Sequence, residues 1–135
     1  MISIDYQGPK IALRDIKKFE GTHNITLPQQ YVDFLLQYNR GYPKESTFKI
    51  SNGEGESLVN KFYHLNDLGR EFEILEGEIP AEFLSIANDP GGNEILLGVS
   101  GEYVEKVYFW VHDRKKENLF FLSHNFSAFY LNLSG

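Results

Sequence analysis

The chain has 135 residues, 41% of them hydrophobic and 24% charged, which is typical of a globular chain, and we predict one domain over residues 1–135. It contains no cysteine, and this excludes a disulfide scaffold, a cysteine nucleophile and any thiolate metal site. No apolar run is long enough to span a bilayer, and the first ten residues lack the pattern of a signal peptide. We therefore expect a cytoplasmic protein without a membrane segment.

The charge is unevenly distributed along the chain. The formal net charge is -6, but residues 52–105 alone hold 12 acidic side chains and only Lys61 and Arg70 as basic ones. A segment of this sign repels phosphate backbones, so a nucleic-acid partner is not expected. It attracts a basic protein partner instead and speeds the encounter with it. The alternative interpretation is that these carboxylates only keep one face hydrated.

Two helices are predicted near the start. Apolar residues at helical spacing predict a first helix from residue 12 that ends near Gly21. A second helix begins with Pro28, which suits a first helical residue because it lacks an N–H. It is ended by Asn39, Gly41 and Pro43, and Gly41 is free to take the left-handed conformation. The apolar side of this second helix consists of Tyr31, Phe34, Leu35 and Tyr38.

The remainder of the chain has the pattern of a sheet. Runs typical of strands cover residues 47–50, 61–65, 94–99, 106–111 and 118–122, and residues 83–87 form a further apolar run. Turn residues occupy 52–55 and 88–93, Asp67 is predicted to cap the stretch that leads to Gly77, and residues 126–133 predict a closing helix. This order predicts an α+β fold, an antiparallel-rich β-sheet covered by helices. The second helix should pack on the strands over 93–99 and 106–111.

No motif in the sequence carries recognisable catalytic chemistry. The four histidines are scattered, which disfavours a zinc site, and the 88–93 turn lacks the alternating oxygen ligands of a calcium loop. The run from Gly98 to Glu102 resembles a nucleophile elbow, but Glu102 stands in place of the second glycine. We therefore predict no catalytic, cofactor-binding or metal-binding residue and no enzyme activity. A hydrolase built on paired glutamates is a minor alternative, because nothing in the sequence desolvates them.

The same residues carry a family resemblance over nearly the whole chain. Phe19-Glu20, Leu27-Pro28 and Asn39-Arg40-Gly41 with Pro43 resemble the opening signature of the SUKH superfamily. The run over 83–97 and the strand around Trp110 are similar to its later blocks. Arg40 is a departure, since members often have glycine there. The superfamily includes the bacterial protein Syd and fungal cell-wall assembly regulators of the Smi/Knr type.

The resemblance implies a binding role without catalytic residues. Many bacterial members look like immunity proteins, so we expect a cytosolic protein that neutralises a cognate toxin, often a nuclease, of a polymorphic or contact-dependent system. The alternative is a regulatory scaffold domain without a toxin partner, as in the fungal relatives. The acidic side chains that we predict to contact a basic toxin domain are Glu54, Glu56, Asp67, Glu71, Glu73, Glu76 and Glu78. Tyr42, Tyr63 and Tyr103 lie near turns and are candidate aromatic anchors.

Overall fold

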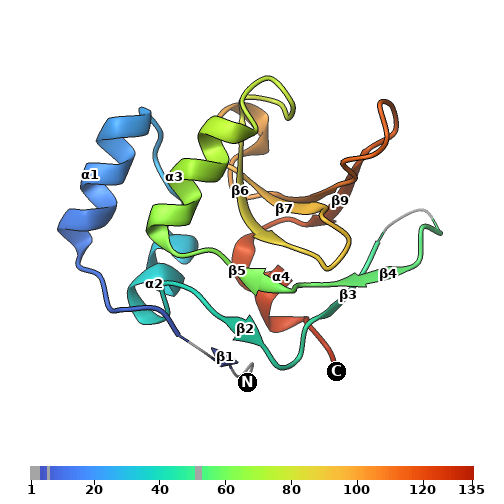
Figure 1. Ribbon diagram of the computed structural model, residues 1–135, viewed down its shortest axis with the longest axis horizontal. Coiled ribbons are helices and arrows are strands. Elements are labelled where there is room, and N and C mark those ends of the chain that lie inside the picture. The colour runs from blue at the N-terminus through green and yellow to red at the C-terminus, as the bar shows by residue number, and fades with distance from the viewer. Residues whose placement is uncertain (1–3, 6, 51–52) are drawn as a thin grey trace.

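A five-stranded antiparallel sheet lies at the centre of the computed structural model, which describes residues 4–5, 7–50 and 53–135 (Figure 1). Its strands follow one another in chain order as β5 (Lys61–Phe62), β6 (Phe83–Asn88), β7 (Glu94–Gly98), β8 (Val107–Trp110) and β9 (Leu119–Ser123). Because each strand pairs with the next one along the chain, short turns suffice to connect most of them. Together with four helices, this sheet confirms the predicted α+β fold.

The helices cover one side and one end of the sheet. They are α1 (Leu13–His23), α2 (Gln29–Gln37), α3 (Leu65–Ile74) and α4 (Phe126–Leu131), and a short 3-10 turn, η1, spans Gly101–Tyr103. Helices α1 and α3 lie side by side at one end of the molecule (Figure 1). Helix α2 contacts α4, so the first and last parts of the chain meet in the core.

Two small ribbons complete the fold. Strand β1 (Ile4–Asp5) pairs with β2 (Tyr42–Pro43), and β3 (Thr47–Lys49) pairs with β4 (Glu56–Leu58). The β3–β4 ribbon extends from the molecule at the end opposite α1 (Figure 1). The sequence did not predict β4, because its alternation places no large apolar side chain in the core. Gly53 and Gly55 have φ of +74° and +88°, as the predicted turn requires, whereas residue 52 lies outside the described residues.

The apolar side of α2 is buried, as its spacing predicted. Tyr31 and Leu35 are fully buried, and Phe34 is 5% exposed. The packing partners differ from the prediction, since the rings around Phe34 come from β5 and α4 rather than from β7 and β8. Their centroids lie 4.9 Å from Phe34 for Phe62 and 5.0 Å for Phe126. Thus α4, a short helix at the end of the chain, closes the core over α2.

Asparagines, not glycines, end the first two helices. Helix α1 continues through Gly21 to His23, and Asn24 then takes the left-handed conformation with φ of 54°. After α2 the left-handed residue is Asn39, with φ of 48°, instead of Gly41. Asparagine tolerates this conformation because its short polar side chain bonds locally. The first helix therefore ends two residues beyond Gly21, whereas the second ends before Asn39 as predicted, and only its left-handed residue differs. Similarly, Pro28 is the N-cap of α2 and not its first residue.

Two glycines give opposite predictions for stability. In β7, a Cβ on Gly98 would overlap the backbone carbonyl oxygen of Tyr103, so Gly98→Ala should lower the free energy of unfolding by about 1–3 kcal/mol. Gly21 lies inside α1 with no atom within 4 Å of such a Cβ, so Gly21→Ala should raise stability by about 0.5–1 kcal/mol. Urea denaturation of the two variants measures both effects. Equal effects of the two substitutions would contradict the close approach at Gly98.

Candidate functional site

Helix α3 is set in place by an unusual cap. The Nδ1 atom of His64 accepts hydrogen bonds from the backbone N–H groups of Asn66, at 3.1 Å, and Asp67, at 3.4 Å. Asp67 is therefore not the N-cap that the sequence predicted. Its carboxylate lies 3.3 Å from Nε2 of His64 and accepts a hydrogen bond from Arg70 at 2.7 Å. A carboxylate in the first turn of a helix is favourable, because the positive end of the helix dipole lies there.

The chain turns back sharply at the end of α3, and this turn separates buried side chains from exposed ones. Leu75 caps the helix, Gly77 takes a φ of +83°, and the N–H of Glu78 donates to the carbonyl of Leu75 at 2.9 Å. Leu75 is buried and Ile79 packs against the same small core cluster, whereas Glu76 and Glu78 are exposed. The turn thus presents carboxylates to solvent directly above apolar side chains.

A hollow of about 520 Å³ opens beneath this turn, and we call it the acidic hollow. Thr22 and His23 of α1 close one side of it, and Glu73 and Glu76 lie at its border. The His23 ring packs between two apolar neighbours, tilted against Phe19 with centroids 4.5 Å apart and edge-on to Phe72 with centroids 5.3 Å apart. The apolar lining consists of Phe72, Leu75, Ile79, Pro80, Ala81 and Phe83. A hollow with an apolar floor and a charged border suits an apolar side chain flanked by charges.

Four carboxylates lie in or just after the last turn of α3, and two of them, Glu73 and Glu76, line the acidic hollow. Within the described part of the chain, Glu71, Glu73, Glu76 and Glu78 form no ion pair with a lysine or arginine. They sit in and after the last turn of α3, which contains no basic residue. The negative end of the helix dipole lies there, so each carboxylate costs about 0.3–1 kcal/mol when exposed at low salt. The sequence therefore places negative charge where it disfavours folding.

The other predicted acidic residues lie elsewhere. Glu54 pairs with Arg114 at 2.9 Å, in the hairpin between β8 and β9. Glu56 lies opposite Lys49 in the β3–β4 ribbon, and Asp67 is held by Arg70 as described above. The ribbon and the end of α3 are well separated in Figure 1. The structure thus places Glu73 and Glu76 at the acidic hollow, leaves Glu71 close enough to Glu94 to raise its pKa, and separates all three from Glu54 and Glu56.

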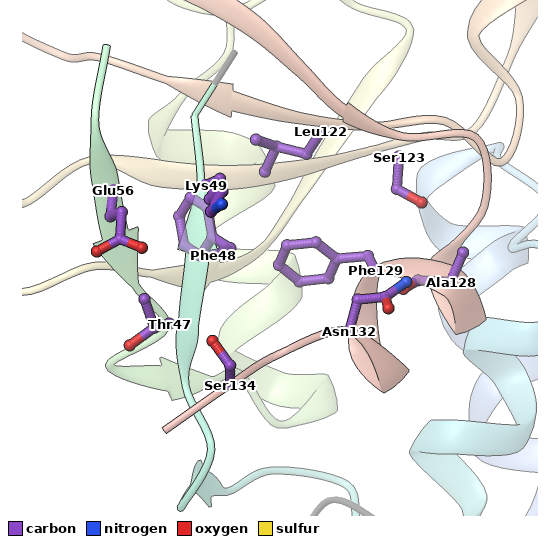
Figure 2. Close-up of a pocket in the computed structure, with 10 residues that line it drawn as sticks. All are labelled: Thr47, Phe48, Lys49, Glu56, Leu122, Ser123, Ala128, Phe129, Asn132 and Ser134. Carbon is purple, nitrogen blue, oxygen red and sulfur yellow. The ribbon is translucent and has the colours of Figure 1, made fainter. Parts of the chain in front are cut away.

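A second hollow, of about 290 Å³, lies between the β3–β4 ribbon, β9 and α4. Figure 2 shows Phe48 and Phe129 pointing toward each other across it, and their ring centroids are 5.7 Å apart. Thr47 and Ser134 exchange backbone hydrogen bonds at its border, at 2.8 and 3.0 Å. Lys49 and Glu56 bring opposite charges, so this hollow carries no net charge that would select a partner.

The structure also reveals a buried carboxyl that sequence reasoning missed. Glu94 of β7 is only 7% exposed, and its Oε1 accepts hydrogen bonds from the Tyr63 hydroxyl and from Oγ of Ser85, each at 2.7 Å. Burial raises the pKa of this carboxyl to about 7, and the negative charge of Glu71 adds to the effect. In the sequence, the only indication of this buried carboxyl is that a glutamate directly begins an apolar strand. Tyr63, a candidate anchor, is thereby accounted for as a buried partner of Glu94.

Among the described residues, no three His, Asp or Glu side chains gather closely enough to hold a metal ion. In the same part of the chain, no helix combines the length and the apolar character needed to cross a bilayer.

Comparison with known proteins gives the family. A family model named SUKH_6 and described as "SMI1-KNR4 cell-wall" matches residues 13–130. The chain belongs to this family. The match confirms the SUKH resemblance and extends from the first residue of α1 nearly to the end of α4. The SUKH family includes immunity proteins, so a role in binding another protein is compatible with this membership.

A curated relative aligns with most of this SUKH chain. It is the SPbeta prophage-derived uncharacterized protein YokK of Bacillus subtilis (strain 168), to which this chain is 25% identical over an alignment of 141 positions, gaps included. The alignment covers 87% of this chain and 72% of the relative. Its name states no activity.

Proposed function

We propose that this SUKH protein is a cytoplasmic immunity protein that binds a cognate toxin domain and neutralises it by contact, without catalysis. Membership of a family that includes immunity proteins supports the class. The acidic hollow supplies the surface, since it joins an apolar pocket of about 520 Å³ to Glu73 and Glu76, which form no ion pair among the described residues. The prophage origin of the Bacillus relative fits a gene that serves in competition between genomes.

The observation that carries the proposal is the position of these carboxylates at the negative end of α3. Glu71, Glu73 and Glu76 occupy sites where a lysine or arginine would stabilise the helix. Residues that lower stability without an internal compensation are characteristic of functional sites. Cations from a bound partner would relieve the repulsion, and the apolar floor would accept an anchor side chain.

The chemistry of the surface also indicates the class of toxin. A nuclease must attract phosphate backbones, so its active face is basic. Such a face complements the border of the acidic hollow, and a tightly bound acidic domain blocks access of nucleic acid. We therefore propose a basic toxin domain, with nuclease activity, as the partner of this chain.

The decisive experiment is co-expression with the toxin gene expected beside this one. Growth should be restored, and the two proteins should co-purify as a complex. If no neighbouring toxin is neutralised and the main partner captured from the source cell is a housekeeping protein, the chain is a regulatory scaffold instead. That outcome would overturn the immunity proposal, although both functions use the family's fold.

Charge reversal at the acidic hollow should slow association with the toxin domain. In Glu73→Lys/Glu76→Lys, both side chains are exposed, so the fold should persist while the on-rate at low salt drops about tenfold or more. The on-rate of the unmodified protein should fall steeply with added salt, since screening shortens the reach of the charges. Stopped-flow association across a salt series measures both.

The matched control places the same charge change at the other end of the molecule. Glu54→Lys/Glu56→Lys alters the net charge equally but lies on the β3–β4 ribbon. We expect a change in on-rate of at most about twofold, because local charge near the contact dominates steering. Equal slowing by both double variants would show that net charge, and not the acidic hollow, guides the encounter.

A further inference from the structure

The sheet face turned away from the main core carries a row of aromatic rings. Side chains alternate along β8, so Val107 and Phe109 join the main core, whereas Tyr108 and Trp110 belong to the smaller cluster on the opposite face. Rings from β6, η1, β8 and β9 continue this opposite face in an unbroken series. We call this series the aromatic strip, and it consists of Phe83, Tyr103, Tyr108, Phe121 and His124.

The rings of the aromatic strip touch in sequence. Centroid separations are 4.9 Å from Phe83 to Tyr103, 5.9 Å from Tyr103 to Tyr108 and 5.6 Å from Tyr108 to Phe121. Phe83 is buried, but Tyr103, Tyr108 and Phe121 are only partly covered. Val104, beside them, is 45% exposed. A connected, partly exposed aromatic surface of this kind is typical of an interaction site.

Carboxylates flank the aromatic strip on the η1 side. Glu102 and Glu105 are exposed, Glu82 is half-buried, and within the described part of the chain none of the three forms an ion pair. The Glu102 carboxylate lies near enough to affect Tyr108, whose pKa is raised by burial and, to a smaller degree, by Tyr103 and Glu102. Negative charge therefore borders aromatic faces, which themselves attract cations.

We propose that the aromatic strip binds arginine and lysine side chains of a basic protein partner, stacked on Tyr103 and Tyr108 with their charged ends held by Glu102 and Glu105. Arginine suits this surface best, because its planar guanidinium stacks on a ring and still donates hydrogen bonds to carboxylates. The proposal rests on the proposed function, since it gives the same partner a second contact region. Phe83 connects the two regions, because it lines the acidic hollow and begins the strip.

Charge complementarity favours a basic partner over a second copy of this chain whose aromatic strip packs against that of the first. Two copies would bring Glu102 and Glu105 of each chain together, on molecules of net charge -6. The other possible contact between two copies would place the basic hairpin of one copy on the aromatic strip of the other. This hairpin contains Arg114, Lys115 and Lys116. That arrangement is an alternative outcome of the test below.

The test titrates the full chain with a nine-residue peptide of alternating arginine and glycine, followed by NMR. The ring resonances of Tyr103, Tyr108 and Phe121 should shift saturably, and the affinity should fall with added salt. A peptide with glutamine in place of arginine should cause no such shift. Equal shifts with the glutamine peptide, or shifts confined to other surfaces, would overturn the proposal.

Two double variants separate the rings from the carboxylates. Tyr103→Leu/Tyr108→Leu should weaken arginine-peptide binding about fivefold or more. Glu102→Gln/Glu105→Gln changes only exposed side chains, so it should fold normally and weaken binding to a similar extent. The charge-matched control, Glu54→Gln/Glu56→Gln, should leave the affinity within about twofold. An unchanged affinity in Glu102→Gln/Glu105→Gln, with the fold intact, would contradict the proposal.

The outcomes for the strip and for the proposed function are distinguishable. If the peptide does not bind but the chain still neutralises a toxin, the strip proposal alone is wrong. If the strip binds the peptide but no toxin is neutralised, the immunity function alone is wrong. Self-association at high protein concentration that is lost in Lys115→Glu/Lys116→Glu would assign the strip to a second copy and overturn the basic-partner proposal.

Discussion

Truncating Phe34 to alanine is expected to destabilise the protein by roughly 3–5 kcal/mol. Phe34 is 5% exposed, and its ring lies within 5.3 Å, centroid to centroid, of Tyr38, Phe62, Phe126 and Tyr130. The four rings come from α2, β5 and α4 and cannot all collapse into the space left behind, so a cavity should remain. The loss is a large share of the total stability of a domain of this size. Thermal or urea denaturation measures it directly.

Asp33→Ala is the matched control for this substitution. Asp33 is the neighbouring residue on α2, and its exposed side chain makes one hydrogen bond, from Gln29 at 2.9 Å. Its replacement should change the free energy of unfolding by at most about 0.5 kcal/mol. If Phe34→Ala were as mild as Asp33→Ala, the closure of the core by α4 would be wrong.

The parts of the fold that sequence predicted are those with a strong local period. Helix α2 repeats apolar residues at helical spacing, and β7 and β8 are short apolar runs, so their existence followed from local pattern. Strand β4 has no such pattern, since Glu56–Leu58 is held by pairing with β3 and by the hydrogen bond from Ser57 to Asp89. The end of α1 was misplaced because a helix tolerates Gly21, while Asn24 ends it equally well.

Only part of the candidate site could be predicted from the sequence. The excess of acidic residues is visible in composition, and the Asp67–Arg70 pair, at 2.7 Å, follows from i, i+3 spacing. The Glu54–Arg114 pair joins residues 60 positions apart, so only the folded chain reveals it. The acidic hollow likewise depends on the turn after α3 meeting α1, a tertiary contact that no local pattern encodes.

The buried carboxyl of Glu94 gives the second large expected effect, a loss of stability as pH rises. Its pKa is raised from an ordinary 4.5 to about 7, chiefly by burial, with the negative charges of Glu71 and Asp89 adding to it. Below about pH 4.5 the carboxyl is protonated in both folded and unfolded states, so its stabilising contribution is fully present. Between pH 4.5 and 7 the unfolded chain releases the proton that the folded chain keeps, and stability falls.

Glu94→Gln is the variant that tests this dependence. Glutamine keeps the side-chain oxygen that accepts from Tyr63 and Ser85 but cannot ionise, so above pH 7 the variant should be more stable than the unmodified protein by up to about 3 kcal/mol. Urea denaturation at pH 5 and pH 8 should show a fall for the unmodified protein and a much flatter response for Glu94→Gln. Glu71→Gln serves as the control, because it removes a neighbouring charge and should shift the fall to lower pH without abolishing it. Parallel curves for the unmodified protein and Glu94→Gln would mean that another group titrates with folding, and that Glu94 is already ionised in the folded protein at pH 5.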